Sequence, residues 1–427
     1  MRLTDKTVVL GVTGGIAAYK AAELVRVLRE RGARVRVVMT RNAQQFITPL
    51  TLQTLSGHPV ATDLWDLTQE SQIGHIDLAD SADALLVAPA TANVVAKLAY
   101  GLADDLLTTV ALATRAKIVL APAMNVHMFD NPAVQENLQR LRARGVRVVA
   151  PDAGSLACGY EGQGRLPDAE VLVEEVGAAL APQDLAGETV LVTAGPTREY
   201  LDPVRFLSNR SSGKMGFAVA RAAARRGARV VLVAGPTALR DPRNVDVIRV
   251  ESAHEMAAAV DAHVADASVV VAAAAVADYR PKRRAADKPA KVQGTVKLEL
   301  ETTRDIVASI GRARRDRIVV GFAAETGDPV ARAREKMARK GLDLVVANDV
   351  TAEGAGFDVE TNVVTLIEAR EERRLPLLDK DDVADAILDR VVGLRAVRGR
   401  GRTPGKPAKA GRRATGERLR LARRRSR

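Results

Sequence analysis

Residues 7–40 read TVVLGVTGGIAAYKAAELVRVLRERGARVRVVMT, and this stretch decides the fold class. The apolar run Thr7–Val12 predicts a buried strand, and Thr13-Gly14-Gly15 predicts a tight turn directly after it. Ala, Leu and Val then recur at helical spacing from Ile16 to Arg31, and a second apolar run follows from Ala33 to Met39. Apolar strands that alternate with helices indicate a parallel sheet covered by helices on both faces.

Residues 188–235 repeat this plan with a longer loop. We expect a strand at Val190–Thr193, a helix from about Lys214, and a strand at Ala228–Ala234. Both helices end in Arg-Gly-Ala-Arg-Val, where the glycine is typical of a helix C-cap. The turn-rich segment 181–187 separates the repeats. The sequence therefore predicts an α/β protein with two doubly wound parallel-sheet domains, residues 1–180 and 187–393.

Composition limits the class of protein. The chain has 427 residues, 47% of them hydrophobic but only 3% aromatic, and a single Cys. One Cys excludes an internal disulfide and fits a cytoplasmic location. Without a long apolar run or a cleavable signal, we expect no membrane segment. Five scattered His and one Cys show no spacing typical of a structural zinc site.

The positive charge of the chain is concentrated at its end. The formal net charge is +12, but residues 395–427 hold 14 Lys or Arg and one Glu, so the rest sums to about −1. A segment rich in Gly, Pro, Ala and Arg lacks core-forming residues, and we expect residues 394–427 to be a disordered basic tail. Contact with nucleic acid or another polyanion is one interpretation. We favour a solvated appendage without a specific partner.

Three segments of the first half follow buried runs or are rich in glycine. Residues 122–133, PAMNVHMFDNPA, follow the apolar run 116–121, and residues 88–93, APATAN, follow the run 84–87. Ligands of open α/β sheets bind beyond the carboxyl ends of strands. Residues 154–167, GSLACGYEGQGRLP, contain Cys158 among four glycines, which indicates a flexible flap. His75 lies among Gly74, Asp77 and Asp80, and an exposed imidazole in such a setting suits proton transfer.

The second half has its own polar loops. Residues 195–216 run from Gly-Pro-Thr-Arg to Ser-Asn-Arg-Ser-Ser-Gly-Lys-Met-Gly and offer dense hydrogen-bonding capacity before a helix. The apolar runs 268–276 and 317–320 end near Asp278 and Phe322. Lys336 and Lys340 lie four residues apart, hence on one helix face.

Taken together, these motifs resemble the bifunctional coenzyme A biosynthesis family, which fuses a phosphopantothenoylcysteine decarboxylase to a phosphopantothenate–cysteine ligase. Several motifs occur in the right order in each half. The resemblance implies a flavodoxin-like flavoprotein domain followed by a Rossmann-like ligase domain. It implies that cysteine is joined to 4'-phosphopantothenate with CTP through an acyl-cytidylate, and that the product is decarboxylated with FMN.

For the decarboxylase half, the resemblance assigns a role to each motif. It implies that Asn125 holds the substrate carboxylate, that His75 is the active-site histidine, and that Cys158 donates a proton in the final reduction. The family usually continues the Asn125 motif with Trp, where this chain has Phe129. The FMN contacts that it implies are Gly14, Gly15, Thr40, Pro89, Thr91 and Asn93.

For the ligase half, the resemblance implies that Asn209 contacts the acyl-cytidylate and that Arg205 helps to form it. It places Asp278, Phe322, Lys336 and Lys340 at the CTP. The family has a Lys-x-Lys-Lys flap, whereas this chain has Lys288-Pro-Ala-Lys291, so Lys288 or Lys291 is the functional flap lysine. Mg²⁺ is expected to bridge phosphate oxygens, with metal ligands left unassigned.

The resemblance also implies a homo-oligomer, built from trimers of the flavin domain and dimers of the ligase domain into a dodecamer. A different class of function stays open at this point. Inactive relatives of the decarboxylase half act as interaction proteins, so the chain could be a flavoprotein binding subunit. Intact His75, Asn125 and Cys158 speak against that alternative.

Overall fold

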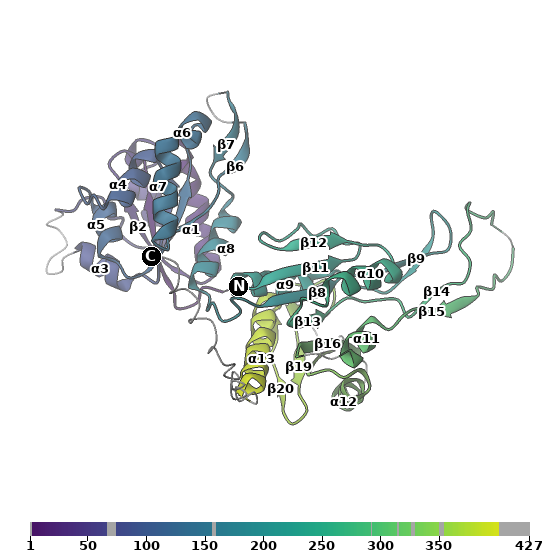
Figure 1. Ribbon diagram of the computed structural model, residues 1–427. Coiled ribbons are helices and arrows are strands. Elements are labelled where there is room, and N and C mark those ends of the chain that lie inside the picture. The colour runs from purple at the N-terminus through teal and green to yellow at the C-terminus, as the bar shows by residue number, and fades with distance from the viewer. Residues whose placement is uncertain are drawn as a thin grey trace, which may run out of the picture.

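The computed structural model describes residues 2–65, 74–155, 159–291, 293–313, 316–325, 329–349 and 354–400, which form two α/β halves (Figure 1). The predicted Cys158 lies outside these residues, as does the segment from 401 onward. No helix in the described part of the chain is long and apolar enough to cross a membrane.

The first half is built on one parallel sheet. Its strands are β1 (Thr7–Val12), β2 (Arg34–Met39), β3 (Ala84–Ala90), β4 (Lys117–Pro122) and β5 (Arg147–Val148), in the order β2-β1-β3-β4-β5. This order is the flavodoxin-like one, with its switch point between β1 and β3. Alternate side chains of each strand enter cores on opposite faces, so Val8 and Leu10 pack on one side and Val9 on the other.

Helices cover both faces of this sheet. One face carries η1 (Ile16–Lys20), α1 (Ala21–Glu30), η2 (Ala43–Gln45), α2 (Pro49–Ser56) and α8 (Ala169–Leu180), and the other carries α3 (Gly74–Ser81), α4 (Ala92–Tyr100), α5 (Leu106–Ala113) and α7 (Pro132–Ala143). The helix predicted from Ile16 begins instead as a 3-10 turn and becomes α-helical at Ala21. The short helix α6 (Val126–Asp130) and the hairpin of β6 (Asp152–Ser155) and β7 (Glu161–Arg165) lie at the carboxyl edge.

The second half has a larger sheet, ordered β12-β11-β8-β13-β16-β17-β19-β20. Its strands are β8 (Thr189–Ala194), β11 (Arg229–Ala234), β12 (Asp246–Arg249), β13 (Val269–Ala272), β16 (Ile318–Glu325), β17 (Leu344–Asp349), β19 (Val364–Ile367) and β20 (Glu372–Arg374). The first six are parallel in the Rossmann order, and β19 and β20 extend the sheet with antiparallel pairing. The predicted pair of doubly wound folds is therefore confirmed.

Helices also sandwich the second sheet. α9 (Lys214–Arg225) and α13 (Lys380–Arg400) cover one face, while α10 (Ala253–His263), α11 (Ile306–Arg312) and α12 (Pro329–Lys340) cover the other. Small pairs complete the half: β9 (Arg198–Tyr200) with β10 (Phe206–Ser208), β14 (Tyr279–Pro281) with β15 (Leu300–Thr302), and β18 (Thr361–Asn362) with β21 (Leu378–Asp379). The strand expected at 268–276 is shorter, because residues after Ala272 leave the sheet.

The tail begins later than the sequence predicts. We place its start at residue 394, yet α13 continues to Arg400, and two of its arginines are anchored on the sheet. Arg395 pairs with Glu188 at 2.6 Å, and Arg398 pairs with Asp343 and donates to the Arg317 carbonyl. The sequence does not reveal these last two turns or so of helix, because their arginines look like part of a basic run but form ion pairs with the domain.

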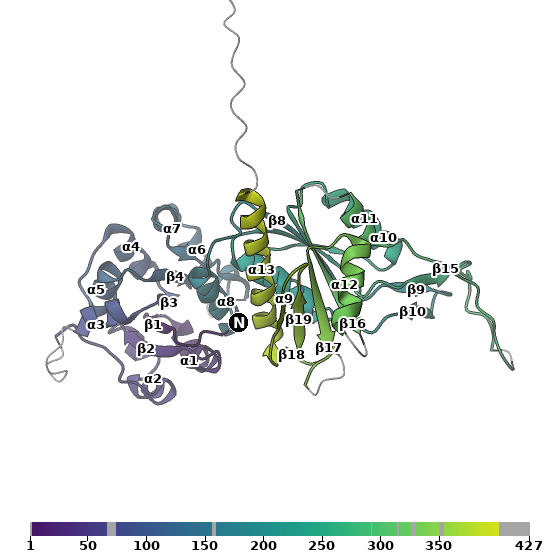
Figure 2. The ribbon, with the colours of Figure 1, turned by 90° about the horizontal axis from the view of Figure 1, so that it is seen from below.

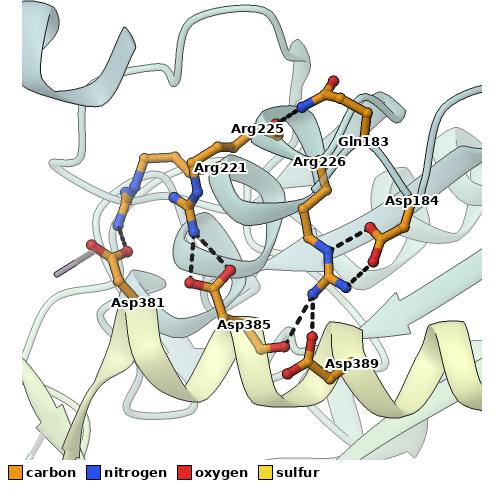
Figure 3. A network of polar contacts seen from close by, with 8 residues as sticks. All are labelled: Gln183, Asp184, Arg221, Arg225, Arg226, Asp381, Asp385 and Asp389. Atoms are coloured by element: carbon orange, nitrogen blue, oxygen red, sulfur yellow. Dashed lines mark hydrogen bonds and ion pairs between the residues drawn. The ribbon is translucent and has the colours of Figure 1, made fainter. Parts of the chain in front are cut away.

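α9 and α13 are joined by a ladder of ion pairs (Figure 3). Arg221 pairs with Asp381 and Arg225 with Asp385, each at 2.7 Å, four residues further along both helices. Arg226, only 3% exposed, pairs with Asp389 at 2.7 Å and with Asp184 of the linker at 2.6 Å. Figure 2 shows α8, α9 and α13 near one another where the two halves meet.

Candidate functional sites

The first candidate site lies at the β1/β3 switch point, where the predicted flavin loops meet. The Thr13 hydroxyl donates to the Pro89 carbonyl at 2.7 Å and accepts from the Thr91 amide at 3.0 Å. Thr91 caps α4, and Asn93 is exposed on the first turn of that helix. Thr40 follows β2, and its amide donates to the Val12 carbonyl at 3.0 Å. The loops after three neighbouring strands therefore converge.

The two glycines of the first loop differ in what surrounds them. A Cβ on Gly14 would lie 2.8 Å from the backbone carbonyl carbon of Asn42, so the fold itself requires glycine there. A Cβ on Gly15 would meet only the Thr91 methyl carbon, at an ordinary 3.7 Å, and Gly15 has an extended backbone. The protein leaves an open space beside Gly15, which fits the close approach of a ligand such as a flavin phosphate.

Asn125 and the Gly-rich hairpin form the second part of this site. Asn125 caps α6 by accepting from the His127 amide at 2.8 Å. The hairpin is pinned to the same segment, since the Met124 amide donates to the Gly164 carbonyl at 3.1 Å. Tyr160 contacts His127 edge to face, with ring centroids 5.0 Å apart. The structure thus brings the predicted substrate motif and the arms of the predicted flap together.

His75 is not on the same element as Asn125. It is half-buried on α3, which lies apart from α6 in Figures 1 and 2. Within the described residues it has no hydrogen bond or ion pair, and the neighbouring Asp77 pairs instead with Arg36 at 3.1 Å. A single chain therefore does not join His75 to Asn125.

The second candidate site is a cavity of about 510 Å³ at the β8/β13 switch point of the larger sheet. Five predicted residues line it: Asn209, Asp278, Phe322, Lys336 and Lys340. The Asn209 amide donates to the Val276 carbonyl at 2.9 Å, which ties the loop after β8 to the loop after β13. Lys336 donates to the Phe322 carbonyl at 2.7 Å.

The ion pair of Lys340 identifies Asp305 as a further residue of the site. The Lys340 ammonium pairs with Asp305 at 2.9 Å, and Asp305 also caps α11 through the Ala308 amide. Although burial acts in the opposite direction, this amide and the Lys340 ammonium lower the pKa of Asp305. Asp305 thus stays ionised and holds Lys340 at the wall of the cavity.

Three residues predicted for the ligase, Arg205 and the alternative flap lysines Lys288 and Lys291, are not in the cavity lining. Arg205 pairs with the buried Asp202 at 2.6 Å, in the turn between β9 and β10. Lys288 and Lys291 are exposed on the long excursion between β14 and β15, which extends away from the domain in Figures 1 and 2. Their predicted roles would require movement of these loops.

Sequence reasoning missed several residues that the fold brings to this cavity, namely Lys214, Arg304, Asp305, Asn362 and Lys380. Lys380 is the first residue of α13, and Asn362 is in a two-residue strand, so neither lies in a recognisable motif. No group of three His, Cys, Asp or Glu side chains that could hold a metal ion occurs in the described ranges.

These features define the class of the protein: two fused α/β domains, each with a candidate ligand site at the switch point of its sheet. A family model described as Flavoprotein matches residues 2–181, and one described as DNA/pantothenate metabolism flavoprotein C-terminal domain matches residues 185–394.

The relatives narrow this class to one family. The chain is 48% identical to the coenzyme A biosynthesis bifunctional protein CoaBC of Bacillus subtilis, with 92% of this chain and 98% of that protein covered. It is 49% identical to the Vibrio cholerae protein of that name, over 90% and 98%, and 47% identical to the Escherichia coli protein, over 92% and 98%. The chain belongs to this family of bifunctional coenzyme A biosynthesis enzymes, and the expectation from its motifs is confirmed.

Proposed function

We propose that this chain joins cysteine to 4'-phosphopantothenate with CTP and then decarboxylates the product to 4'-phosphopantetheine. Residues 187–393 would carry the ligase and residues 1–180 the FMN-dependent decarboxylase. The observation that carries the proposal is the convergence of Asn209, Asp278, Phe322, Lys336 and Lys340 on one cavity in a member of this family. The alternative of a binding subunit without decarboxylase activity is not favoured.

In the ligase, the residues of the cavity would have different roles. Phe322 would contact the nucleotide base and Asp278 the nucleotide or its metal ion, and Lys336 and Lys340 would neutralise the triphosphate. A bound Mg²⁺ would supply further neutralisation of its charge. Asn209 would hold the acyl-cytidylate with the assistance of Arg205. Lys288 or Lys291 would close over the cavity from the long excursion while the cysteine amine attacks.

In the decarboxylase, the loops of Gly14, Gly15, Thr40, Pro89, Thr91 and Asn93 would hold FMN. Bound FMN supplies a reversible two-electron oxidation of the substrate thiol, without which loss of CO2 would leave an unstabilised carbanion. Asn125 would orient the substrate carboxylate, and the hairpin pinned to α6 would exclude water. His75 would assist the early proton transfer, and Cys158 would donate the last proton.

We further propose a cytoplasmic homo-oligomer, with the dodecamer as the expected form. The separation of His75 from Asn125 supports a site completed by a second copy. Large apolar side chains left exposed on the first half also support it, among them Tyr19, Trp65, Tyr100 and Leu112. The single Cys fits a reducing compartment.

The test is a complete reaction with the purified, FMN-loaded chain. With 4'-phosphopantothenate, cysteine, CTP and Mg²⁺ together, it should release CO2, CMP and diphosphate, and omission of any one of the three substrates should stop CO2 release. Cys158→Ser should still bind FMN and release CO2, but its flavin should stay bleached, because a serine hydroxyl is a far weaker acid than a thiol. Ligation without any CO2 release would leave only the binding-subunit alternative for the first half.

A further inference from the structure

A buried lysine at the wall of the ligase cavity has no place in the proposed chemistry so far. Lys380 is 5% exposed and lines the cavity at the start of α13. Its ammonium donates to the carbonyls of Gly356 at 2.9 Å, Phe357 at 3.1 Å and Val359. An ammonium has three donors, so these three carbonyls satisfy it completely.

The carbonyls belong to one segment, residues 354–362, which we call the strap. The strap is also fixed at its far end, because Thr361 and Asn362 pair with β21 and the Asn362 amide donates to Asn348 at 3.0 Å. Gly356, Phe357 and Asn362 of the strap line the cavity. Lys380 therefore sets the position of this wall through the strap backbone.

Apart from the hydrogen bond of Asn362 to Asn348 at its far end, the strap contacts one part of the cavity. Arg210 pairs with Asp358, Ser212 donates to the Phe357 carbonyl, and Lys214 donates to the Asp358 carbonyl at 2.6 Å. All three come from the loop after β8 or from the first residue of α9. The nucleotide residues Lys336 and Lys340 are held separately, by the Phe322 carbonyl and by Asp305.

The side chains at this wall carry a small net positive charge, which favours an anionic ligand: Lys380, Lys214 and Arg210 face the strap carboxylates Asp358 and Glu360. Among the residues that the structure describes, no carboxylate accepts a hydrogen bond from Lys380. The Lys214 ammonium acts on Lys380 electrostatically, and Asp358 and Glu360 act on it in the opposite direction. Burial, aided by that neighbouring ammonium, lowers the pKa of Lys380. Both lysines lie beside the amino end of the twelve-residue helix α9, where backbone amides also favour negative charge.

We propose that Lys380 is a positioning residue for the ligase: by clamping the strap against the loop 209–214, it shapes the pocket for the phosphate end of 4'-phosphopantothenate rather than for the nucleotide. This inference rests on the proposed ligase function and deepens it. It assigns no chemical step to Lys380.

The test compares Michaelis constants in the full-length, FMN-loaded chain. Lys380→Met keeps the length of the side chain but leaves three carbonyls without their donor. We expect the KM for 4'-phosphopantothenate to rise about tenfold or more, because the strap is no longer held against the loop 209–214 by hydrogen bonds from a charged group. The KM for CTP and the decarboxylation of added phosphopantothenoylcysteine should stay within about twofold of wild type, since Lys336 and Lys340 are held by the Phe322 carbonyl and by Asp305 and the decarboxylase lies in the other half.

Arg225→Met is the matched control. It breaks the Arg225–Asp385 pair between the same two helices but does not touch the strap. A lower unfolding temperature with both KM values unchanged is expected for it. Equal changes in the two KM values of Lys380→Met, or the same kinetic change in Arg225→Met, would reduce Lys380 to a stabilising residue and overturn the inference.

A second measurement needs no variant, in case Lys380→Met does not fold. Amide hydrogen exchange of residues 354–362 in the wild-type chain should slow with 4'-phosphopantothenate and not with CTP alone. Protection by CTP alone, or by neither, would overturn the inference while the ligase function stands. A wild-type chain that fails to ligate with all three substrates would instead refute the proposed function itself.

Discussion

At the scale of single residues, Gly14 and Gly15 illustrate two different reasons why a position can need glycine. Gly14 is required by the fold, because any side chain would run into the backbone of Asn42. Gly15 is not required by any neighbour within the described part of the chain, since its Cβ would have room and its backbone is extended. A reason outside the polypeptide is then needed for Gly15, and a bound flavin supplies one.

We therefore expect Gly15→Ala to leave the unfolding temperature of the flavin-free chain within about 2 °C of wild type, because Ala fits there without strain. Its FMN affinity should fall by about tenfold, since the new methyl group occupies the space where the ligand approaches. Gly14→Ala should instead unfold several degrees lower even without FMN. Fluorescence titration and calorimetry measure both effects. Wild-type affinity in Gly15→Ala would remove this loop from the flavin site.

At the scale of elements, the contact between α9 and α13 depends on Arg226. The residue ends α9, is almost fully buried, and joins the linker through Asp184 to α13 through Asp389 (Figure 3). Although burial opposes it, hydrogen bonding to both carboxylates raises the pKa of Arg226, and the hydrogen bond from Arg226 lowers the pKa of Asp184. The contact between α9 and α13 therefore rests on the burial of Arg226 as well as on its ion pairs with Asp184 and Asp389.

Arg226→Met should destabilise the second half by about 1–3 kcal/mol, because it removes the charged hydrogen bonds to Asp184 and Asp389, whose side chains are 31% and 68% exposed and stay hydrated. Arg229→Met is the control, since Arg229 and Asp246 are both 67% exposed and 3.7 Å apart. It should cost about 0–1 kcal/mol. Denaturant unfolding of the full chain, followed in the second half, measures both. Equal losses in the two variants would show that burial of Arg226 contributes nothing.

The Arg226–Asp184 ion pair makes the stability of the second half depend on pH. The pKa of Asp184 is lower in the folded chain than in the unfolded one, so its contribution is complete above the ordinary carboxyl pKa. It is lost as pH falls through the lowered folded value. Arg226→Met should accordingly show a shallower loss of stability on acidification than the wild-type chain, in denaturant unfolding repeated across the acidic range. Parallel pH profiles for the two chains would contradict this linkage.

At the scale of the whole molecule, the described part of the chain ends with α13, whose last turns are anchored on the second sheet. Arg395 and Arg398 fasten the last turns to Glu188 at the start of β8 and to the largely buried Asp343 before β17. Their charge belongs to the domain, although the sequence places them in a run of basic residues.

Truncation after Arg400 should leave both activities and the unfolding temperature nearly unchanged. Truncation after Gly393 should lower the unfolding temperature of the second half by about 4–8 °C, because losing two anchored ion pairs corresponds to about 2 kcal/mol in a domain of this size. Calorimetry of the two truncated chains measures the difference. A loss of activity in the chain truncated after Arg400 would show that the tail has a role that its composition does not indicate.

The sequence alone determined the elements, the fold class and most loops of both sites. Apolar runs, helical spacing and glycine turns are local signals, and the right-handed crossover rule converts alternating strands and helices into doubly wound sheets. Loops after parallel strands meet at one edge of their sheet. The sequence is therefore enough to group Gly14, Pro89 and Asn125 in one site, and Asn209 and Asp278 in the other.

Only the tertiary structure decided which distant residues complete the sites. Lys380 reaches the cavity because α13 returns along α9, and Arg398 becomes an anchor because Asp343 lies beneath it. The same packing keeps α3, which carries His75, apart from α6, which Asn125 caps. Lys288 lies between β14 and β15 and is not in the cavity lining. Such contacts depend on side chains far apart in the chain, and their energies arise only when the sheet and its helices are assembled.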